Sequence, residues 1–362
     1  MKKTAIVLLV LVLAMLMSAC ASPDVTPTPQ DPTSTNLEKG NNYNADMENV
    51  NVNQSKGHIW PWEDPSIVLP PFSGETTPAG SIKSLKVLAL GDSSSKDSLQ
   101  FLAKLALEAG IKDVKVGMLY RNGGGALDGQ CKDFNNNTAS YTYHVDTGDG
   151  WVSTPNAKAQ DVLKSEKWDV VIVHQNLCNQ PDAKTYGPLT EFVNSIDNIL
   201  RVGTGNANKN ADAKIYFMQV WAYEINNRNN LYNHTKYYQN PTTKAYDQKL
   251  MHNTAVDTIK AQVVPQKNID GVIPVGTAIQ NMRESYWSDG MTKDAEFLSN
   301  TGKVAAAVAM FKFITGYDIN GMTLSDPVFD HARTHIGVII ESANNAYLNP
   351  FATTPSVYHV DN

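Results

Sequence analysis

Cysteine, charge and basic clusters are all scarce in this chain. Only three of its 362 residues are cysteine, which excludes a disulfide-rich scaffold. Charged residues make up 18%, the net charge is −6, and no cluster of Lys and Arg provides the basic surface that a nucleic-acid partner requires. After the N-terminal region, no segment is long and apolar enough to cross a bilayer. The composition therefore excludes nucleic-acid binding and predicts a soluble domain, with an apolar fraction of 42% to form its core.

The N-terminus has the pattern of an export signal that ends at a cysteine. Two lysines are followed by an apolar run over Ala5–Met17, and small residues stand directly before Cys20. So short a run at the start of a chain is typical of a signal peptide rather than a spanning helix. The ending resembles the lipobox of bacterial lipoproteins; an ordinary secretory peptide is the alternative. We expect a signal peptide at 1–19 and a lipid on Cys20 that anchors the protein to the extracytoplasmic face of the cell membrane.

The composition changes again along the rest of the chain. Residues 20–57 are mostly Pro, Thr, Asn, Asp and Ser with almost nothing to bury, which predicts a disordered tether. Residues 58–84 contain two tryptophans, Phe72 and Pro-rich turns, and we expect them to pack as an N-terminal arm. Residues 85–350 alternate short apolar runs with amphipathic segments, which predicts a single domain.

The alternation within 85–350 is that of strands and helices. Strands are expected at 86–90, 114–120, 168–173, 214–220 and 271–275, and a hairpin over 141–152. Helices are expected at 97–109, 157–166, 187–202, 243–262, 276–286, 302–315 and 331–347. This spacing implies right-handed βαβ units and a mostly parallel sheet, so the fold class is α/β.

Polar segments follow the predicted strands. Ligands of an open parallel sheet bind outside the carboxyl ends of its strands, and four of the five ends here are rich in Gly, Ser, Asn, Gln or His. Ser93 stands between a strand and a helix, where an exposed hydroxyl and free N–H groups suit a nucleophile that forms an oxyanion. The alternative is that Ser93 and the next two serines only cap the helix.

Four motifs resemble the SGNH/GDSL hydrolase superfamily, in the order of that family. They are Leu88–Ser93, Gly123–Leu127, Trp168–Gln175 and Asp294–Gly302. The segment Lys86–Asp97 is more closely similar to an uncharacterised, lipoprotein-rich branch that reads G-N-S-F-S at this point. The resemblance covers residues 85–318 and implies a three-layer α/β/α, flavodoxin-like domain.

The resemblance also implies roles for individual residues. Ser93 would be the nucleophile, and its N–H together with that of Gly124 or Gly123 would stabilise the oxyanion. Gln175 or Asn176 would stand in place of the family's third-block asparagine. No cofactor and no metal are implied.

The residue that should be the base departs from the family. Asp294 would orient the base, but the family pattern D-x-x-H requires histidine where this chain has Phe297, which cannot accept a proton. Three readings follow. The domain keeps its site only for binding, or His174 replaces the base from the end of its strand, or a carboxylate of Glu296 or Asp289 acts as a weaker base.

These expectations lead to two functions. The first is a cell-envelope serine ester hydrolase that acts on a small ester, with the O-acetyl group of a glycan as the suggested substrate. The alternative is an inactive SGNH-like lipoprotein that binds glycans. Aromatic residues within 221–238 could stack on sugar rings, although packing on the core is the commoner explanation.

For two further pairs of residues, the sequence allows more than one structural role. Cys131 and Cys178 both follow predicted strands and could pair in an oxidising compartment. His331 and His335 lie four apart on one predicted helix, a spacing that can hold a metal, but no other ligand completes the set. An ordinary helix surface is therefore preferred for the two histidines.

Overall fold

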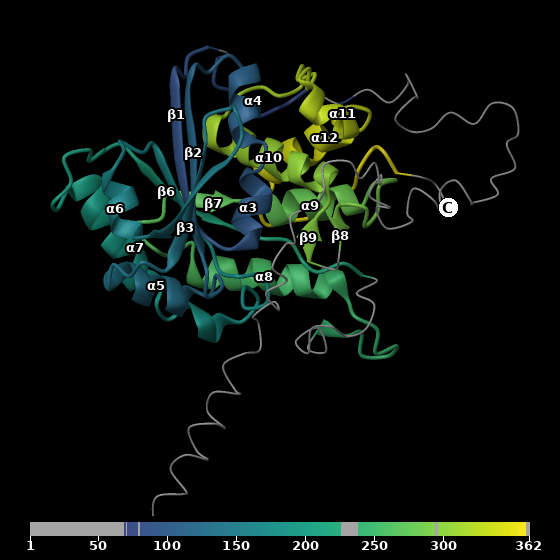
Figure 1. The fold of residues 1–362 in the computed structure, drawn as a ribbon. Helices are drawn as coiled ribbons and strands as arrows, with labels where there is room; N and C mark the ends of the chain where they lie inside the picture. The colour runs from purple at the N-terminus through teal and green to yellow at the C-terminus, as the bar shows by residue number, and fades with distance from the viewer. Residues whose placement is uncertain (1–68, 70, 79, 226–237, 294–295, 360–362) are drawn as a thin grey trace, which may run out of the picture. The chain divides into compact units, whose positions relative to one another are not determined.

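The computed structural model describes residue 69 and residues 71–78, 80–225, 238–293 and 296–359 (Figure 1). A seven-stranded sheet lies between two layers of helices, which confirms the predicted three-layer α/β/α class. Its strands are β1 (Ser84–Gly91), β2 (Asp113–Arg121), β3 (Tyr141–Asp146), β4 (Val152–Ala157), β5 (Val170–Val173), β6 (Lys214–Met218) and β7 (Gly271–Ile273).

The strands are arranged in the order β4-β3-β2-β1-β5-β6-β7. All pairs from β2 to β7 are parallel, and the predicted hairpin β3–β4 is confirmed as an antiparallel extension beyond β2. The chain passes from β1 to β2 on one side and later returns to β5 on the other. The direction of strand order therefore reverses between β1 and β5, and in open α/β sheets ligands bind at such a switch point.

Alternation along the strands explains why both faces of the sheet are covered. In β1, Leu85, Val87 and Ala89 belong to one buried cluster, whereas Leu88 and Leu90 belong to the other. Successive side chains of a strand point to opposite faces, so an uninterrupted apolar run supplies two cores at once. The apolar runs in the sequence therefore predict central strands.

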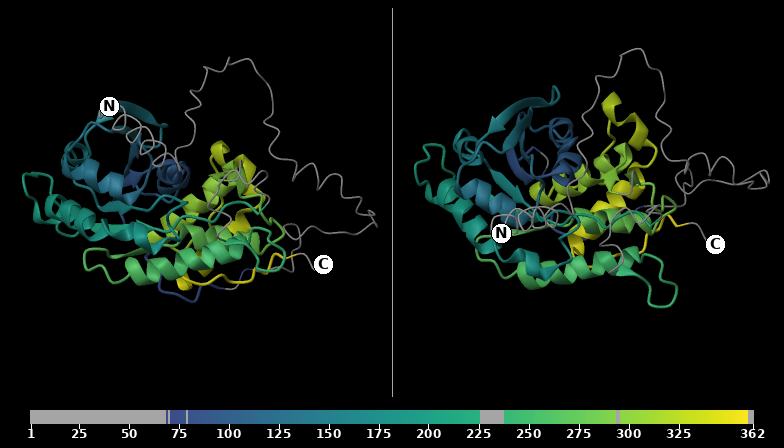
Figure 2. Two further views of the ribbon diagram at one scale, coloured as in Figure 1. Left: turned by 90° about the horizontal axis from the view of Figure 1, so that it is seen from below. Right: turned by 60° about the horizontal axis from the view of Figure 1, so that its bottom comes forward.

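The helices divide between the two faces of the sheet (Figures 1 and 2). One layer contains α5 (Leu127–Asn135), α6 (Ala159–Lys164) and α7 (Leu189–Asp197). The other contains α3 (Ser93–Leu99), α4 (Leu102–Glu108), α9 (Val275–Arg283), α10 (Asn300–Thr315) and α12 (Ile336–Leu348). Helix α8 (Gln248–Gln262) contributes side chains to both clusters. Smaller elements are the 3-10 turns Ala183–Tyr186 and Pro327–Phe329, the π-helical turn Asn198–Val202, the hairpin β8 (Thr292–Lys293) and β9 (Phe297–Leu298), and α11 (Asp330–Arg333). No helix in these described ranges has the length and hydropathy needed to cross a membrane.

Helix α10 is buried on nearly all sides, and one of its buried residues is a lysine. The ammonium group of Lys312, with the side chain fully buried, donates a hydrogen bond to the carbonyl of Tyr317 at 2.8 Å. It also lies 3.7 Å from the ring centre of Phe72 and 4.8 Å from that of Tyr347. The carbonyl and the two aromatic faces replace water around the charge, while burial lowers the pKa of Lys312. Phe72 thereby attaches the segment before β1 to α10 and α12; Trp60 and Trp62 lie outside the described residues.

Several helix predictions are wrong in where the helices begin or break. The helix expected at 97–109 is two helices, α3 and α4, and α3 begins at Ser93 because the carboxylate of Asp92 caps it by accepting the N–H of Ser94 at 2.9 Å. The helix expected at 243–262 begins only at Gln248. The helix expected at 331–347 is two helices, α11 and α12, that separate His331 from His335. The two histidines therefore do not share one helix face, and the spacing that could hold a metal is not formed.

The possible disulfide between Cys131 and Cys178 is not formed. Cys131 is a free thiol, buried in α5. Burial and the nearby carboxylate of Glu191 raise its pKa to about 11, so it stays protonated at neutral pH.

His252 on α8 gives the fold a sensitivity to acid. The side chain is almost fully buried, and neither ring nitrogen has a hydrogen-bond partner among the described residues. Burial, with a smaller contribution from Arg283, lowers its pKa to about 4. An unfolded histidine has a pKa of about 6.5, so between these values the unfolded chain binds a proton that the folded chain does not.

The free energy of unfolding should therefore fall as the pH decreases from about 6.5 to about 4, with His252 contributing up to about 3 kcal/mol of the loss. Urea denaturation at several pH values, for the wild type and for His252→Gln, measures this contribution. The variant should lose less stability than the wild type between these two pH values. Burial also lowers the pKa of His335 to about 4, but His335 is present in both proteins, so its contribution cancels in the comparison. Parallel pH profiles for the two proteins would contradict the assignment.

Candidate functional site

The turn between β1 and α3 is followed by three consecutive serines, of which only the first is accessible to solvent. Ser93 is partly exposed, whereas Ser94 and Ser95 are buried. The cap of the helix is Asp92 rather than a serine, so the hydroxyl of Ser93 is not needed for capping. Helix α3 is short, and its dipole is correspondingly a small part of the electrostatics here. The turn thus leaves the Ser93 hydroxyl available to a ligand at the switch point between β1 and β5.

Arg121 orients the glycine loop that follows β2. Its Nη1 donates to the carbonyls of Gly123 at 2.8 Å and Gly124 at 2.7 Å, and its Nε lies 2.7 Å from the carboxylate of Asp133. In a trans peptide the carbonyl and the next N–H point in opposite directions. With the Gly124 carbonyl held by Arg121, the N–H of Gly125 therefore points away from the arginine.

Gly125 is the glycine that reaches the serine turn. A Cβ at this position would lie 2.3 Å from Oδ2 of Asp92, so only glycine allows the loop to approach so closely. Its N–H makes no hydrogen bond in the described part of the chain. Gly123 is exposed, and the N–H of Gly124 already donates to the carbonyl of Arg121 at 3.2 Å. The expected oxyanion donor is therefore better assigned to Gly125 than to Gly123 or Gly124.

His174 lies beneath the serine turn and stabilises it. The ring is fully buried against the Cα of Gly91, where a Cβ would lie only 1.9 Å from Nε2. Nε2 accepts the N–H of Asp92 at 3.4 Å, and Nδ1 donates to the carbonyl of Gln175 at 2.9 Å. These bonds require the tautomer with hydrogen on Nδ1. No hydrogen bond joins His174 to Ser93 within the described residues, and the hydrogen bonds that His174 makes are to the backbone around the serine turn.

Two glutamines connect the loops around the site. The side chain of Gln175 accepts the N–H groups of Leu127 at 3.1 Å and Asn176 at 3.0 Å, which makes it a structural residue. Gln130, fully buried on α5, donates from Nε2 to the carbonyls of Gly125 and His174. Sequence analysis missed Gln130, since a glutamine inside a helix carries no local sign of a role in distant loops.

Asn176, after the end of β5, is one of several buried polar side chains that have an atom without a hydrogen-bond partner among the described residues. The residue is 8% exposed, its Oδ1 is buried without a partner, and its amide makes no hydrogen bond to the described residues. A buried amide without a partner costs free energy, so its retention favours a ligand that completes it. Of the two residues expected here, Asn176 is therefore the one available for binding.

The segment expected to carry the base lies along α3. The N–H of Leu298 donates to Oδ2 of Asp97 at 2.9 Å, one helical turn after Ser93. Phe297 thus stands in β9 beside the serine helix, where a proton acceptor was expected. Asp294 lies outside the described residues.

Asp97 also connects α3 to α10. Its Oδ1 lies 3.4 Å from Nζ of Lys303. Burial raises the pKa of Asp97, an effect that the ammonium group and the Leu298 N–H oppose. The carboxylate therefore holds three segments together, and this role differs from that of a free acid or base.

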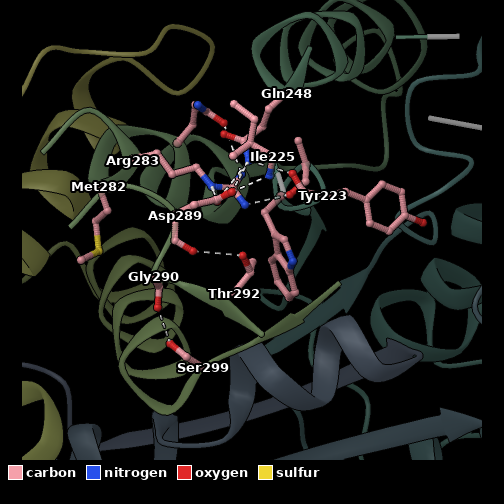
Figure 3. A network of polar contacts seen from close by, with 12 residues as sticks. Tyr223, Ile225, Gln248, Met282, Arg283, Asp289, Gly290, Thr292 and Ser299 are labelled. Atoms are coloured by element: carbon pink, nitrogen blue, oxygen red, sulfur yellow. Dashed lines mark hydrogen bonds and ion pairs between the residues drawn. The ribbon is translucent and has the colours of Figure 1, made fainter. Parts of the chain in front are cut away.

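The alternative base Asp289 belongs to another network (Figure 3). It is 4% exposed, and its Oδ1 lies 2.7 Å from Nε of Arg283, although that N–H does not point at the oxygen as in a hydrogen bond. Its Oδ2 accepts the N–H of Ile225. A carboxylate with these partners is already neutralised and is not available to Ser93.

The two described aromatic residues nearest the end of β6 do not offer a stacking surface. Trp221 and Tyr223 are 1% and 2% exposed, and Nε1 of Trp221 donates to the carbonyl of Glu296 at 2.7 Å. Tyr238 is partly buried, and Tyr232 and Tyr237 lie outside the described residues. For the two described residues nearest β6, packing on the core is the role that the structure gives.

The fold and the site define an α/β domain in which hydrogen-bond donors from three loops follow the carboxyl ends of β1, β2 and β5. The chain belongs to the DUF4886 family, a domain of unknown function, whose model matches residues 86–331. A crystal structure of a DUF4886 family protein from Bacteroides uniformis is similar, with 27% identity and a TM-score of 0.64 over 75% of this chain and 97% of that one. No curated protein matches the chain.

The close approach of Gly125 to Asp92 can be tested by substitution. Gly125→Ala should lower the free energy of unfolding by about 1–3 kcal/mol, because the added methyl group overlaps the carboxylate that caps α3. Gly187→Ala is the matched control, since a Cβ at Gly187 meets no atom within 4 Å and its φ is −48°. Chemical denaturation compares the two variants, and equal stabilities would show that the loop lies farther from the turn.

Proposed function

We propose that this chain is a cell-envelope lipoprotein whose SGNH-like domain binds an acyl carbonyl, such as an O-acetyl group of a glycan, without hydrolysing it efficiently. The observation that carries this proposal is the position of Phe297. The Leu298–Asp97 hydrogen bond places this segment along α3, so the residue that should supply the base is apolar. The order of the four motifs along the fold supports the SGNH-like assignment.

Binding of a carbonyl is supported by the donors that remain. The hydroxyl of Ser93, the N–H of Gly125 and the amide of Asn176 come from the ends of β1, β2 and β5, which are neighbours in the sheet. Groups of this kind are the ones that hold a carbonyl or oxyanion oxygen in acyl-transfer sites. Each hydrogen bond contributes about 0.5–1.5 kcal/mol in net terms, so the three suit a weak, specific interaction.

Hydrolysis is disfavoured because, among the described residues, the two side chains considered as replacement bases already have other partners. His174 already uses Nε2 to accept the N–H of Asp92, and Asp289 is paired with Arg283. A general base supplies a factor of about 10² to 10⁴ in rate. Without it a serine hydroxyl stays protonated and is a poor nucleophile.

The suggestion of an esterified glycan rests on location and charge. An exported protein that is anchored through Cys20 meets the polysaccharides of the envelope. The net charge of −6 repels strongly anionic polymers, whereas an acetylated sugar is neutral.

Restoring the base is the experiment that tests the proposal. Phe297→His should hydrolyse p-nitrophenyl acetate faster than the wild type by a factor of about 10² to 10⁴. A fluorophosphonate probe should label this variant at Ser93 and leave the wild type unlabelled. Ser93→Ala combined with Phe297→His should abolish both effects, and Phe297→Tyr controls for a polar side chain at this position.

Two results would contradict the proposal. Labelling of wild-type Ser93, with turnover near that of Phe297→His, would establish an active hydrolase with another base, and His174→Ala would then be examined. A Phe297→His variant that folds but gains no activity would show that position 297 is not where the base belongs.

Lipidation of Cys20 is tested separately by metabolic labelling with a palmitate analogue in a bacterial host. The wild type should incorporate label and fractionate with membranes, whereas Cys20→Ala should do neither, because no other group provides a comparable anchor. Cys131→Ala is the matched control and should behave as the wild type. Label on Cys20→Ala, or none on the wild type, would refute the lipoprotein assignment.

A further inference from the structure

A cavity of 390 Å³ lies away from the serine turn, within the size range of small-molecule sites. Its walls come from the segment before α8, the start of α8, the end of α9 and the loop after α9. None of the residues that line it belongs to the turn after β1, the glycine loop after β2 or the end of β5. The cavity is therefore a separate candidate site.

Arg283 lines this cavity and is buried. Figure 3 shows the polar network to which it belongs. The side chain of Arg283 is 3% exposed; Nη2 donates to the carbonyl of Ala222 at 3.0 Å and Nη1 to Oε1 of Gln280 at 3.3 Å. A guanidinium has five N–H groups, so one on each terminal nitrogen has no partner among the described residues. Gln280, 1% exposed, uses its oxygen for Arg283, and its Nε2 donates to none of the described residues.

Charges around the cavity are paired, so its walls do not favour an anion. Asp289 neutralises Arg283, with Nε and Oδ1 2.7 Å apart, and Lys249 pairs with Glu284 at 2.8 Å. Asp247 remains as a further carboxylate, which caps α8 by accepting the N–H of Leu250. A carboxylate or phosphate ligand would therefore meet a wall of net negative charge.

The other lining groups are hydroxyls, amides and small apolar surfaces. They are Asn240, Thr243 and Ser288 on the polar side, and Ile225, Ala245 and Tyr246 on the apolar side. A sugar ring carries hydroxyl groups around its edge and C–H groups on its faces. It matches such walls without bringing a charge.

We propose that this cavity binds a neutral saccharide unit, with the unused N–H groups of Arg283 and Gln280 donating to its hydroxyl oxygens. The site is independent of acyl binding at Ser93. It would give the protein a second contact with a glycan, and two linked contacts raise the overall affinity above that of either alone.

The test uses isothermal titration of the full-length protein with cellobiose and lactose as neutral probes, neither of which carries an acyl group, and glucuronic acid as the anionic comparison. At least one neutral probe should bind, and at least tenfold more tightly than glucuronic acid. Thr243→Trp and Ala245→Trp, both at exposed lining positions, should each weaken that binding at least tenfold by filling the cavity. Thr242→Trp, also exposed but outside the lining, should leave it unchanged.

Each other outcome overturns the proposal. They are no binding of either neutral disaccharide, tighter binding of glucuronic acid, or full binding by both tryptophan variants with unchanged melting temperatures. Ser93→Ala separates the two sites, since it should retain disaccharide binding. Loss of binding in Ser93→Ala would assign the saccharide to the serine turn and would refute a second site.

Discussion

The packing of the His174 ring on Gly91 is the contact on which the site depends. It occurs where β1 and β5 end side by side, at the one place in the sheet where strand order reverses. Because Gly91 has no side chain, the imidazole can lie under the turn and accept the N–H of Asp92. Asp92 is in turn free to cap α3 and to contact Gly125. One buried ring thereby sets the relative positions of three loops.

This arrangement has a chemical consequence. In this arrangement the free lone pair of His174 accepts the backbone N–H of Asp92 rather than the Ser93 hydroxyl. Phe297 stands in β9 beside α3, and the turn after β1 and the loop after β2 present hydrogen-bond donors. Donors alone hold a carbonyl oxygen but do not activate a nucleophile. The proposed recognition of an acyl carbonyl rests on these donors.

Beyond β6 a second buried network has a different physical basis. The pair formed by Arg283 and Asp289 is almost fully desolvated, and such pairs add little net stability because each charge loses its water. Their value lies in orientation, since the carboxylate also holds the backbone of Ile225. The indole of Trp221 connects this region to the segment beside α3 through its hydrogen bond to Glu296. The two candidate sites thus share a rigid scaffold without sharing residues.

The sequence by itself determined the layered fold. Uninterrupted apolar runs predicted the central strands, including β1 and β5, because the period of burial along a strand is a local property of the chain. The turn residues Gly148, Asp149 and Gly150 predicted the hairpin β3–β4. The order of the four motifs also identified Ser93 and Asn176 as candidate site residues. The break between α11 and α12 was missed, since the apolar pattern runs across it.

Only the tertiary structure decided which of these residues act together. Gly125 rather than Gly124 meets the serine turn because Arg121 orients the loop, and no local pattern encodes that contact. His174 packs under the serine turn, Cys131 is a free thiol, and Trp221 is buried. In each case the contacts come from residues that are distant in the sequence. The periodicity of apolar residues predicts which side chains are buried. The hydrogen-bond partner of a buried polar group depends instead on packing between segments that are far apart in the sequence.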